Sequence, residues 1–477
     1  MENNFNLSEP AEIKPKKRKI KTIIFFFIFI FFIFFSIRAF VSAPDQNSWL
    51  NKFPVISQFK FLAESANNQL KGEERDRINI LLLGMGGKNH DGGYLTDTIV
   101  LASLKPSTKQ AALVSIPRDL TVPIEGMGWR KINNVNALAE RKNPGSGGLA
   151  ASQVVSDTFN LPIDYYFLVD FDGFIKIIDE IGGIKVYVEN AFDDYTYPAR
   201  GKEEAFPYEA RFEHLHFEKG LQEMDGSLAL KYARSRHAPG IEGSDFARAR
   251  RQQKIIEAIK NKTLSSYILF KPQMVSNIIS TIEEHMNTNL KIWEVVKLWN
   301  VFKEIKQEDI INRVLDNSPS GLLSDSISSD GAYILTPQSG DFNEIQYLIE
   351  NIFNQGSAET KMEILEEKAA LEILNGTWIN GLASKYSVDL ENFGFNIVRL
   401  GNSSEQNFDK SVIYDLSNGQ KIKSLQILRQ RTNANISSFL PDWLKADIAA
   451  SSIQPDFILI LGQDADKTFS GAQNKNE

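Results

Sequence analysis

The feature that most constrains this fold is a regular alternation of strand-like and helix-like segments between residues 78 and 188. Residues 78–83 form an uninterrupted apolar run ended by Gly84, which is typical of a buried strand. Two more strands are predicted at 98–104 and 111–116. Further along, the patterns predict helices at 132–141 and 149–159, a strand at 165–169, a helix at 174–181 and a strand at 184–188. Such alternation predicts an α/β fold, a central sheet covered by helices in an α-β-α sandwich.

The first domain is expected to close near residues 333–337, and a smaller domain follows it. Aromatic and charged residues with two prolines predict a surface loop near the site at 193–216, and helical patterns occupy 221–232 and 246–259. A polar linker is expected at 341–367. Strand patterns at 371–376, 395–400, 411–416 and 457–462 and a helical pattern at 421–429 predict a small α/β domain over residues 368–465, before a polar, disordered tail at 466–477.

The amino terminus has the pattern of a membrane anchor. A cluster of lysines and one arginine within residues 14–21 precedes an apolar run at 23–35 made almost entirely of Ile and Phe. Basic residues before an apolar segment predict a cytoplasmic tail (1–21), a single-pass anchor (22–41), a stalk (42–75) and an extracytoplasmic remainder at the cell membrane. The apolar run is short and Val41-Ser42-Ala43 resembles a cleavage site, so a cleaved signal peptide is the alternative.

Composition excludes several classes of protein. A chain of 477 residues has room for two or three domains. A net charge of -7 argues against a general nucleic-acid binder. The absence of cysteine excludes disulfides, thiol catalysis and zinc sites built on thiolates.

Several arginines stand beside apolar elements of the first domain. They are Arg118, Arg234, Arg236, Arg248 and Arg251. If the fold brings these guanidinium groups to one cleft, they repel each other unless an anion lies between them. The pattern therefore predicts an anion site, and the anion it favours is a phosphate.

The segment beginning at Asp245 is the most informative of these. Asp245 is a natural N-cap, which places Arg248 and Arg251 in the first turns, where the helix dipole disfavours a cation by about 0.3–1 kcal/mol. With Gln252 they are expected to share one face and bind a phosphate at the helix amino terminus. The alternative is a solvated basic face, and for Arg234 and Arg236 it is a helix carboxyl terminus that carries favourable cations.

Asp97 precedes a predicted strand, where a carboxylate can hold Mg²⁺ against a phosphate oxygen. The alternative is an ordinary turn residue. The glycines at 84, 86 and 87 match neither a P-loop nor a dinucleotide fingerprint. The sequence also lacks a nucleophile elbow and an HExxH motif, so serine-hydrolase and zinc-hydrolase readings have no support.

Several motifs, taken in chain order, resemble the LytR-CpsA-Psr family. They are Leu82-Leu83-Gly84, Thr96-Asp97-Thr98, Ser115-Ile116-Pro117-Arg118-Asp119, Lys131-Ile132-Asn133, Gly182-Gly183-Ile184, Tyr232-Ala233-Arg234-Ser235-Arg236 and the segment from Asp245 to Gln252. The resemblance covers roughly residues 76–340. Residues 368–465 resemble the LytR C-terminal domain that often follows, through Leu374-Asn375-Gly376 and Ile460-Leu461-Gly462.

This resemblance implies a mixed central sheet and a membrane-anchored enzyme. Such enzymes move a phosphate-linked glycopolymer from a polyprenyl-pyrophosphate carrier to a peptidoglycan hydroxyl and release polyprenyl phosphate. Asp97, Arg118, Arg234 and Arg236 would then be catalytic, and Lys131, Arg248, Arg251, Gln252 and Asp119 would bind substrate. Mg²⁺ would be held by Asp97. The family's usual second acidic residue is replaced by Gly86 in this chain, so either Asp91 takes its place or phosphate and water alone complete the shell.

Two other functions remain open from the sequence. One is a non-catalytic module that binds polyprenyl phosphates or wall glycans and acts as a regulator. The other is a lipid-pyrophosphate hydrolase, in which water replaces the sugar acceptor. The chemistry favours group transfer, because phosphoryl transfer needs positioning and charge neutralisation more than covalent help.

Overall fold

The computed structural model of the chain describes residues 68–466, apart from 89, 91, 200, 203, 266–284, 355–357 and 438, and the backbone alone at 264, 265, 292, 358 and 359. The predicted anchor, most of the stalk, Asp91 and nearly all of the predicted C-terminal tail therefore lie outside the described residues. Within the described ranges, no helix has both the length and the apolar character needed to cross a membrane.

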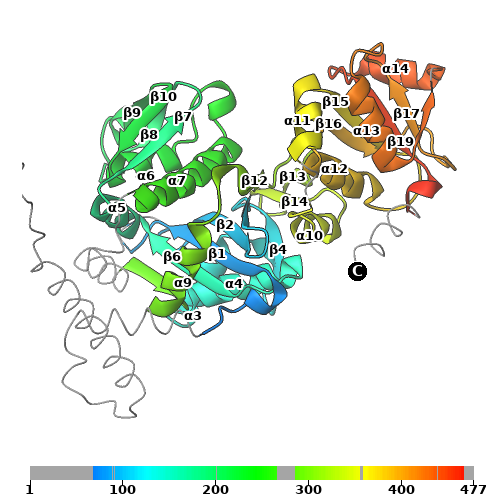
Figure 1. Ribbon diagram of the computed structural model, residues 1–477. Helices are drawn as coiled ribbons and strands as arrows, with labels where there is room; N and C mark the ends of the chain where they lie inside the picture. Colours follow the sequence, from blue (N-terminus) through cyan, green and yellow to red (C-terminus); the bar gives the residue numbers. More distant parts are fainter. Residues whose placement is uncertain are drawn as a thin grey trace, which may run out of the picture. The chain divides into compact units, whose positions relative to one another are not determined.

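A six-stranded sheet forms the centre of the first domain (Figure 1). In spatial order its strands are β11 (Met286–Thr288), β6 (Tyr165–Asp170), β1 (Ile78–Met85), β2 (Thr96–Lys105), β3 (Gln110–Ser115) and β12 (Ile310–Val314). Strand β1 is antiparallel to β2 and parallel to β6, whereas β3 is antiparallel to β2 and parallel to β12. The mixed α/β fold expected from the sequence is confirmed.

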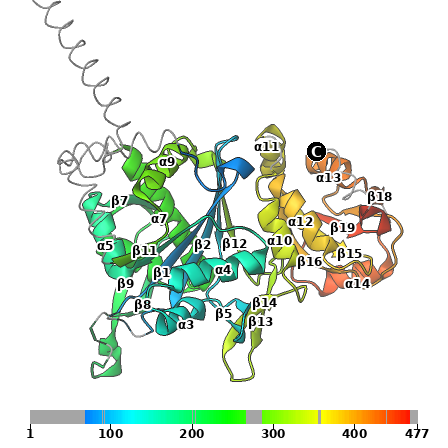
Figure 2. The same ribbon diagram turned by 90° about the horizontal axis from the view of Figure 1, so that it is seen from below.

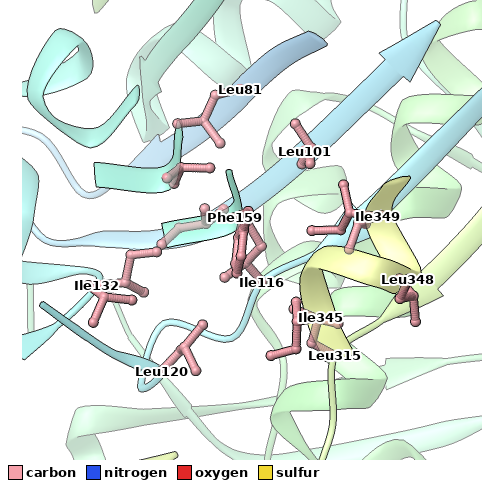
Figure 3. Packing of buried hydrophobic residues seen from close by; sticks show 14 of the residues in the cluster. Leu81, Leu101, Ile116, Leu120, Ile132, Phe159, Leu315, Ile345, Leu348 and Ile349 are labelled. Carbon is pink, nitrogen blue, oxygen red and sulfur yellow. The ribbon is translucent and has the colours of Figure 1, made fainter. Parts of the chain in front are cut away.

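Helices cover one face of this sheet through the largest apolar core of the domain. Alternate residues of a strand point to opposite faces, and Leu81 and Leu101 lie on this face. Figure 3 shows them with Phe159 and with Ile345 and Ile349. The helices on this side are α3 (Asn134–Lys142), α4 (Gly147–Phe159) and α10 (Asn343–Glu350).

The opposite face is covered by α7 (Asp245–Ser265) and α9 (Ile292–Phe302). Ile256 of α7 packs on Val100 and Leu113 of the strands. Figure 2 shows α7 and α4 on opposite sides of the sheet. The order of layers is therefore helix, sheet, helix.

A third group of elements packs against α7 and carries part of the candidate site. It contains α5 (Phe171–Glu180), β7 (Ile184–Val188), β8 (Phe192–Pro198), β9 (Phe212–Phe217), β10 (Gly220–Met224) and α6 (Gly226–Arg234). Two predictions differ from the structure in this region. The predicted loop at 193–216 begins and ends in strands, since 193–198 belong to β8 and 212–216 to β9, and the loop proper is limited to the connection between them. The helix predicted at 221–232 divides into β10 and α6, because β10 pairs with β7.

Two further hairpins follow β3 and β12 along the chain. They are β4 (Thr121–Ile124) with β5 (Gly128–Lys131), and β13 (Leu323–Ile327) with β14 (Tyr333–Pro337). They meet where Leu120 bridges to Leu335. Helix α10 lies inside the expected linker at 341–367, and its apolar side belongs to the first core, so the first domain extends past residue 340.

The second domain has a five-stranded sheet, in the order β16 (Asn396–Asn402), β15 (Ala370–Asn375), β19 (Phe457–Leu461), β17 (Val412–Asp415) and β18 (Asn435–Ser437). Its helices are α11 (Ala358–Glu367), α12 (Leu382–Asn392), α13 (Ile422–Thr432) and α14 (Asp442–Ala450). The four longer strands and α13 were predicted, whereas α11, α12, α14 and β18 were not. Helices α12 and α13 pack with Leu371 and Ile373 on one face, and α14 packs with Leu374 and Ile458 on the other.

Candidate functional site

The pairing of β2 and β3 brings Asp97 and Arg118 together. Val100 is opposite Ser115 in this antiparallel pair, so continuing the register places the start of β2 beside the residues that follow β3. Arg118 Nη1 lies 3.0 Å from Asp97 Oδ1. The Asp97 side chain is 43% exposed and that of Arg118 is 21% exposed, so the carboxylate is the part of the pair that solvent or a ligand reaches more easily.

Asp119 links Arg118 to Lys131. Its Oδ1 lies 2.7 Å from Lys131 Nζ, and its Oδ2 lies 3.5 Å from Arg118 Nε. Its backbone carbonyl accepts the Leu335 amide at 3.0 Å. Asp119 is therefore built into the site with both cations as neighbours, which fixes their orientation in the structure.

The start of α7 supplies another carboxylate and two of the expected site residues. Ser244, and not Asp245, is the N-cap, because its hydroxyl accepts the Ala247 amide at 3.0 Å. Asp245 is the first helical residue, and its Oδ1 lies 2.9 Å from Arg248 Nη1 and 3.9 Å from Arg236 Nη1. An acidic residue in the first turn therefore compensates for arginine at the unfavourable end of the helix.

These residues line a pocket of about 190 Å³, called here the arginine pocket. Its polar lining consists of Asp97, Ser115, Arg118, Asp119, Asp245, Arg248, Gln252 and Tyr333. The structure thus brings together five residues predicted to act on substrate, some from β2 and the segment after β3 and others from α7. They are Asp97, Arg118, Asp119, Arg248 and Gln252. Gln252 is oriented by donating to the Ala233 carbonyl at 3.3 Å.

Charges in and beside the pocket are nearly balanced. Burial alone would lower the pKa of Arg118, but the charges of Asp97 and Asp245 outweigh it and raise this pKa. Burial lowers the pKa of Arg248 to about 10, although Asp245 opposes the shift. The repulsion expected between the arginines is therefore reduced, because carboxylates of the protein lie beside them. Four cations and three carboxylates leave an excess of one positive charge, which still favours an anion.

The loop that carries Arg236 is held by Asp194, a residue the sequence did not single out. Asp194 is fully buried, and its Oδ2 accepts the Ser235 hydroxyl at 2.7 Å and the amides of Arg236 and His237 at 3.2 and 3.3 Å. Burial would raise the pKa of Asp194, but these hydrogen bonds and one from Thr196 hold it below its usual value. This carboxylate is therefore ionised and fixes the backbone beneath Arg236.

Arg251 holds the same loop from the other side and does not enter the arginine pocket. It is 2% exposed and donates to the carbonyls of Tyr232, Ser235 and Glu242. Its Nη1 also lies 2.7 Å from Glu242 Oε2. The structure therefore does not bring Arg251 to the arginine pocket as expected, because its guanidinium is bound by Glu242 and by these carbonyls.

Arg234 also differs from the expected arrangement. Its guanidinium lies 4.2 Å from the centre of the Phe171 ring and 5.5 Å from that of Tyr197, whose hydroxyl accepts from Nη1 at 3.2 Å. Arg234 is not among the residues lining the arginine pocket. Its contacts with Phe171 and Tyr197 hold it outside the pocket that Arg118 and Arg248 line.

The described residues contain no group of three or more His, Asp or Glu that could by itself hold a metal ion. Asp97 is nevertheless suitable for Mg²⁺, because Mg²⁺ in phosphate sites is bound through one or two carboxylates, with waters and phosphate oxygens completing the shell. Asp91, the second expected ligand, lies outside the described residues. No all-protein metal cage is therefore present in the described part, and phosphate would have to contribute.

Sequence reasoning missed Asp194, Asp245 as a site residue, and Tyr333. Asp245 stood next to Arg248 with helical spacing, and that signal was available. Asp194 had no such signal, because its partners are more than 40 residues away in the chain.

Comparison with known proteins identifies the family. The LytR-CpsA-Psr family model matches residues 52–351, and the model described as LytR cell envelope-related transcriptional attenuator matches residues 368–464. The first match alone covers more than half of the chain. The chain belongs to the LytR-CpsA-Psr family. The LytR-CpsA-Psr match ends at the end of α10, in agreement with the packing of that helix.

Several LytR-CpsA-Psr relatives carry functional names. A polyisoprenyl-teichoic acid--peptidoglycan teichoic acid transferase, TagU of Oceanobacillus iheyensis, is 33% identical over 212 residues, which is 44% of this chain and 59% of the relative. TagV of Bacillus subtilis, with the same activity in its name, is 28% identical over 51% of this chain and 57% of its own. The cell wall biosynthesis protein LcpA of Corynebacterium glutamicum is 24% identical over 74% of this chain and 67% of its own.

This chain thus spans less than two thirds of the length of TagU and TagV. Among solved structures, the crystal structure of B. subtilis TagV matches 59% of this chain and 98% of its own, with 25% identity and a TM-score of 0.44.

Proposed function

We propose that this protein is a membrane-anchored phosphotransferase that joins a glycopolymer to peptidoglycan. It would take the phosphate-linked polymer from a polyprenyl-pyrophosphate carrier and release polyprenyl phosphate. The observation that carries this proposal is the arginine pocket, where Arg118 and Arg248 converge with Asp97 at the edge of the sheet. The names of TagU and TagV support the same reaction class.

In this reaction the acceptor hydroxyl oxygen forms a bond to the phosphorus that bears the glycopolymer. The bridging P–O bond to the carrier phosphate breaks, and the hydroxyl proton ends on the released polyprenyl phosphate. Negative charge develops on that leaving phosphate, and preorganised cations stabilise it. Arg118 and Arg248 are preorganised because Asp97 and Asp245 hold them within 3.0 Å and 2.9 Å.

Arg236 is the cation with the weakest protein partner in this cluster, at 3.9 Å from Asp245. Its guanidinium can therefore turn to a phosphate oxygen at little cost. We assign Mg²⁺ to Asp97, where the ion would neutralise phosphate oxygens when bound. Lys131 and Gln252 would orient the head group of the carrier.

The anchor and the extracytoplasmic location rest on the basic cluster before the Ile and Phe run. A periplasmic-type or cell-surface reporter fused after Glu477 is expected to be active only outside the cytoplasm, with the protein retained in membranes after a salt wash. Recovery of a soluble form that begins near Pro44 would replace the anchor by a cleaved signal.

The function is tested by mixing the full-length protein with a polyprenyl-pyrophosphate-linked sugar, peptidoglycan fragments and Mg²⁺, and weighing the products. A sugar phosphate joined to the fragment, with release of polyprenyl phosphate, is expected. Free sugar phosphate in the presence of acceptor would indicate a hydrolase. Binding of the carrier without turnover would indicate a non-catalytic regulator.

A further inference from the structure

The second domain contains a polar cavity of about 360 Å³ that is separate from the arginine pocket. It shares Leu374, Leu444 and Ile458 with the core between the second sheet and α14, so it lies on that face of the sheet. Its polar lining includes Glu372 of β15, and Arg399 and Asn402 of β16. Ser404 from the loop after β16 and Asp447 of α14 complete it. Leu374, Leu444 and Ile458 supply an apolar part of the wall.

Glu372 is the unusual residue of this cavity. It is 3% exposed, although the neighbouring positions of β15 are apolar and buried. Its Oε1 lies 3.0 Å from Arg399 Nη1, and the Arg399 side chain is 38% exposed. Burial raises the pKa of Glu372, Arg399 opposes that shift, and Asp447 adds to it.

A buried ion pair is weak evidence of a purely structural role. Replacing such a pair by apolar residues of similar volume is often neutral or stabilising, because desolvation of the two charges offsets their attraction. The adjacent core, with Leu374, Leu444, Ile458 and Ile460, shows that apolar side chains are accommodated on this face. A buried carboxylate that faces a cavity and whose pKa is raised by burial is instead a feature of ligand sites.

The second carboxylate of the cavity comes from α14. Asp447 accepts a hydrogen bond from the Ser404 hydroxyl, which ties the helix to the loop after β16. Asp447 is therefore held in place, and it is less buried than Glu372. The cavity thus offers acceptors from two carboxylates and donors from the guanidinium of Arg399 and the amide of Asn402.

We propose that this cavity binds a neutral sugar residue of a wall glycan. Each sugar hydroxyl donates one hydrogen bond and accepts others, so it can use the carboxylates and the guanidinium at the same time. The two carboxylates disfavour a phosphate, and an apolar ligand would leave the charges desolvated and unpaired. The volume lies in the range of about 300–1,000 Å³ found for small-molecule sites. The second domain is then a glycan-binding module, and this inference does not depend on the reaction of the first domain.

The proposal is tested by isothermal titration calorimetry of the full-length protein with N,N′-diacetylchitobiose, a disaccharide of N-acetylglucosamine. Glu372→Gln and Asp447→Asn are each expected to weaken binding by about tenfold or more, since each removes a charged hydrogen-bond acceptor. Asp447→Asn keeps the test valid if Glu372→Gln does not fold. Asp442→Asn is the matched control, because this carboxylate is on the same helix but 96% exposed and paired with Lys445; it should bind like the wild type.

Three results would overturn the proposal. The first is no heat of binding for the disaccharide with the wild type. The second is an equal loss of binding in Asp442→Asn. The third is that the protein binds inorganic pyrophosphate or putrescine but not the disaccharide, and that Asp447→Asn weakens this binding.

Discussion

Asp194 and Arg251 bind opposite sides of one residue, Ser235. The Asp194 carboxylate accepts the Ser235 hydroxyl at 2.7 Å, and the Arg251 guanidinium donates to the Ser235 carbonyl. Neither side chain lines the arginine pocket. Together they fix the backbone from which Arg236 extends, so they act on the proposed reaction by positioning and not by contact with substrate.

The substitution Asp194→Asn tests the first half of this brace. An amide has one acceptor oxygen, so either the three donors that share Oδ2 or the Thr196 amide on Oδ1 lose their partner, and the remaining hydrogen bonds lose the help of the negative charge. We expect a loss of about 1–3 kcal/mol in the free energy of unfolding and a lower turnover number with Mg²⁺ dependence retained. Asp193→Asn is the control, because this carboxylate is partly exposed and bonds to His214 and His216. If Asp193→Asn lowers stability and turnover as much as Asp194→Asn does, Asp194 has no special part in holding Ser235 and Arg236.

The contribution of Asp194 should also depend on pH. Its folded-state pKa is depressed below the ordinary 3.8, so its stabilising effect is fully present above pH 3.8 and is lost as the pH falls through the folded value. The difference in unfolding free energy between wild type and Asp194→Asn should stay constant from pH 7 to about pH 5 and shrink below about pH 4. Urea denaturation at a series of pH values measures it, and a difference that grows on acidification would show that another group is responsible.

The substitution Arg251→Met tests the second half. Removing this buried cation takes away the donor to Glu242 Oε2 and the donor to the Ser235 carbonyl, and leaves the Glu242 carboxylate without its positive partner. We expect destabilisation of about 3–5 kcal/mol, seen as a lower urea midpoint. Arg250→Met is the matched control on the exposed side of the same helix. If Arg251→Met keeps wild-type stability but fails to bind a polyprenyl pyrophosphate, Arg251 belongs to the substrate site after all.

Sequence reasoning found the sheet because its central strands are buried on both faces. Residues such as Leu81 and Leu82 contact different cores on the two sides, and that produces a continuous apolar run. The meeting of Asp97 with Arg118 was expected only through the family resemblance. Physically it follows from the β2–β3 register, which no local pattern in the sequence specifies.

Other parts were missed for different physical reasons. Asp194 was assigned to a loop because its segment is rich in charged and aromatic residues and holds two prolines, and its function depends on distant partners. Arg251 was expected in the pocket because its spacing places it on the same helix face as Arg248, but its guanidinium is bound by Glu242 and by the Ser235 carbonyl, contacts that no local pattern specifies. Helix α12 had a usable signal, since Leu382, Tyr386 and Leu390 recur every four residues and all are buried.

Arg236 and Arg234 should respond differently to truncation. Arg236→Ala removes a 36% exposed side chain whose carboxylate partner is 3.9 Å away, so the melting temperature without ligand should change little. Binding of a polyprenyl pyrophosphate should weaken by about 2 kcal/mol or more. Arg234→Ala removes the stacking on Phe171 and should lower stability with a smaller effect on binding. If Arg236→Ala unfolds the domain and the remaining folded fraction transfers normally, Arg236 is a structural ion-pair partner and not a substrate ligand.

Asp97→Asn separates the chemistry from the binding of the carrier. The substitution removes the carboxylate assigned to Mg²⁺ and also removes the negative partner of Arg118 at 3.0 Å. Transfer should be abolished, and Mg²⁺ or a chelator should no longer change carrier binding. Affinity for the pyrophosphate should be retained or increased, because the excess positive charge of the pocket rises when a carboxylate is lost. Calorimetry with the carrier, with and without Mg²⁺, measures binding, and mass analysis of the products measures transfer.

Asp119→Asn is the comparison within the pocket, because Asp119 already contacts Lys131 and Arg118. This variant should weaken transfer while the dependence on Mg²⁺ stays. Transfer by Asp97→Asn that still requires Mg²⁺ would place the metal on another residue.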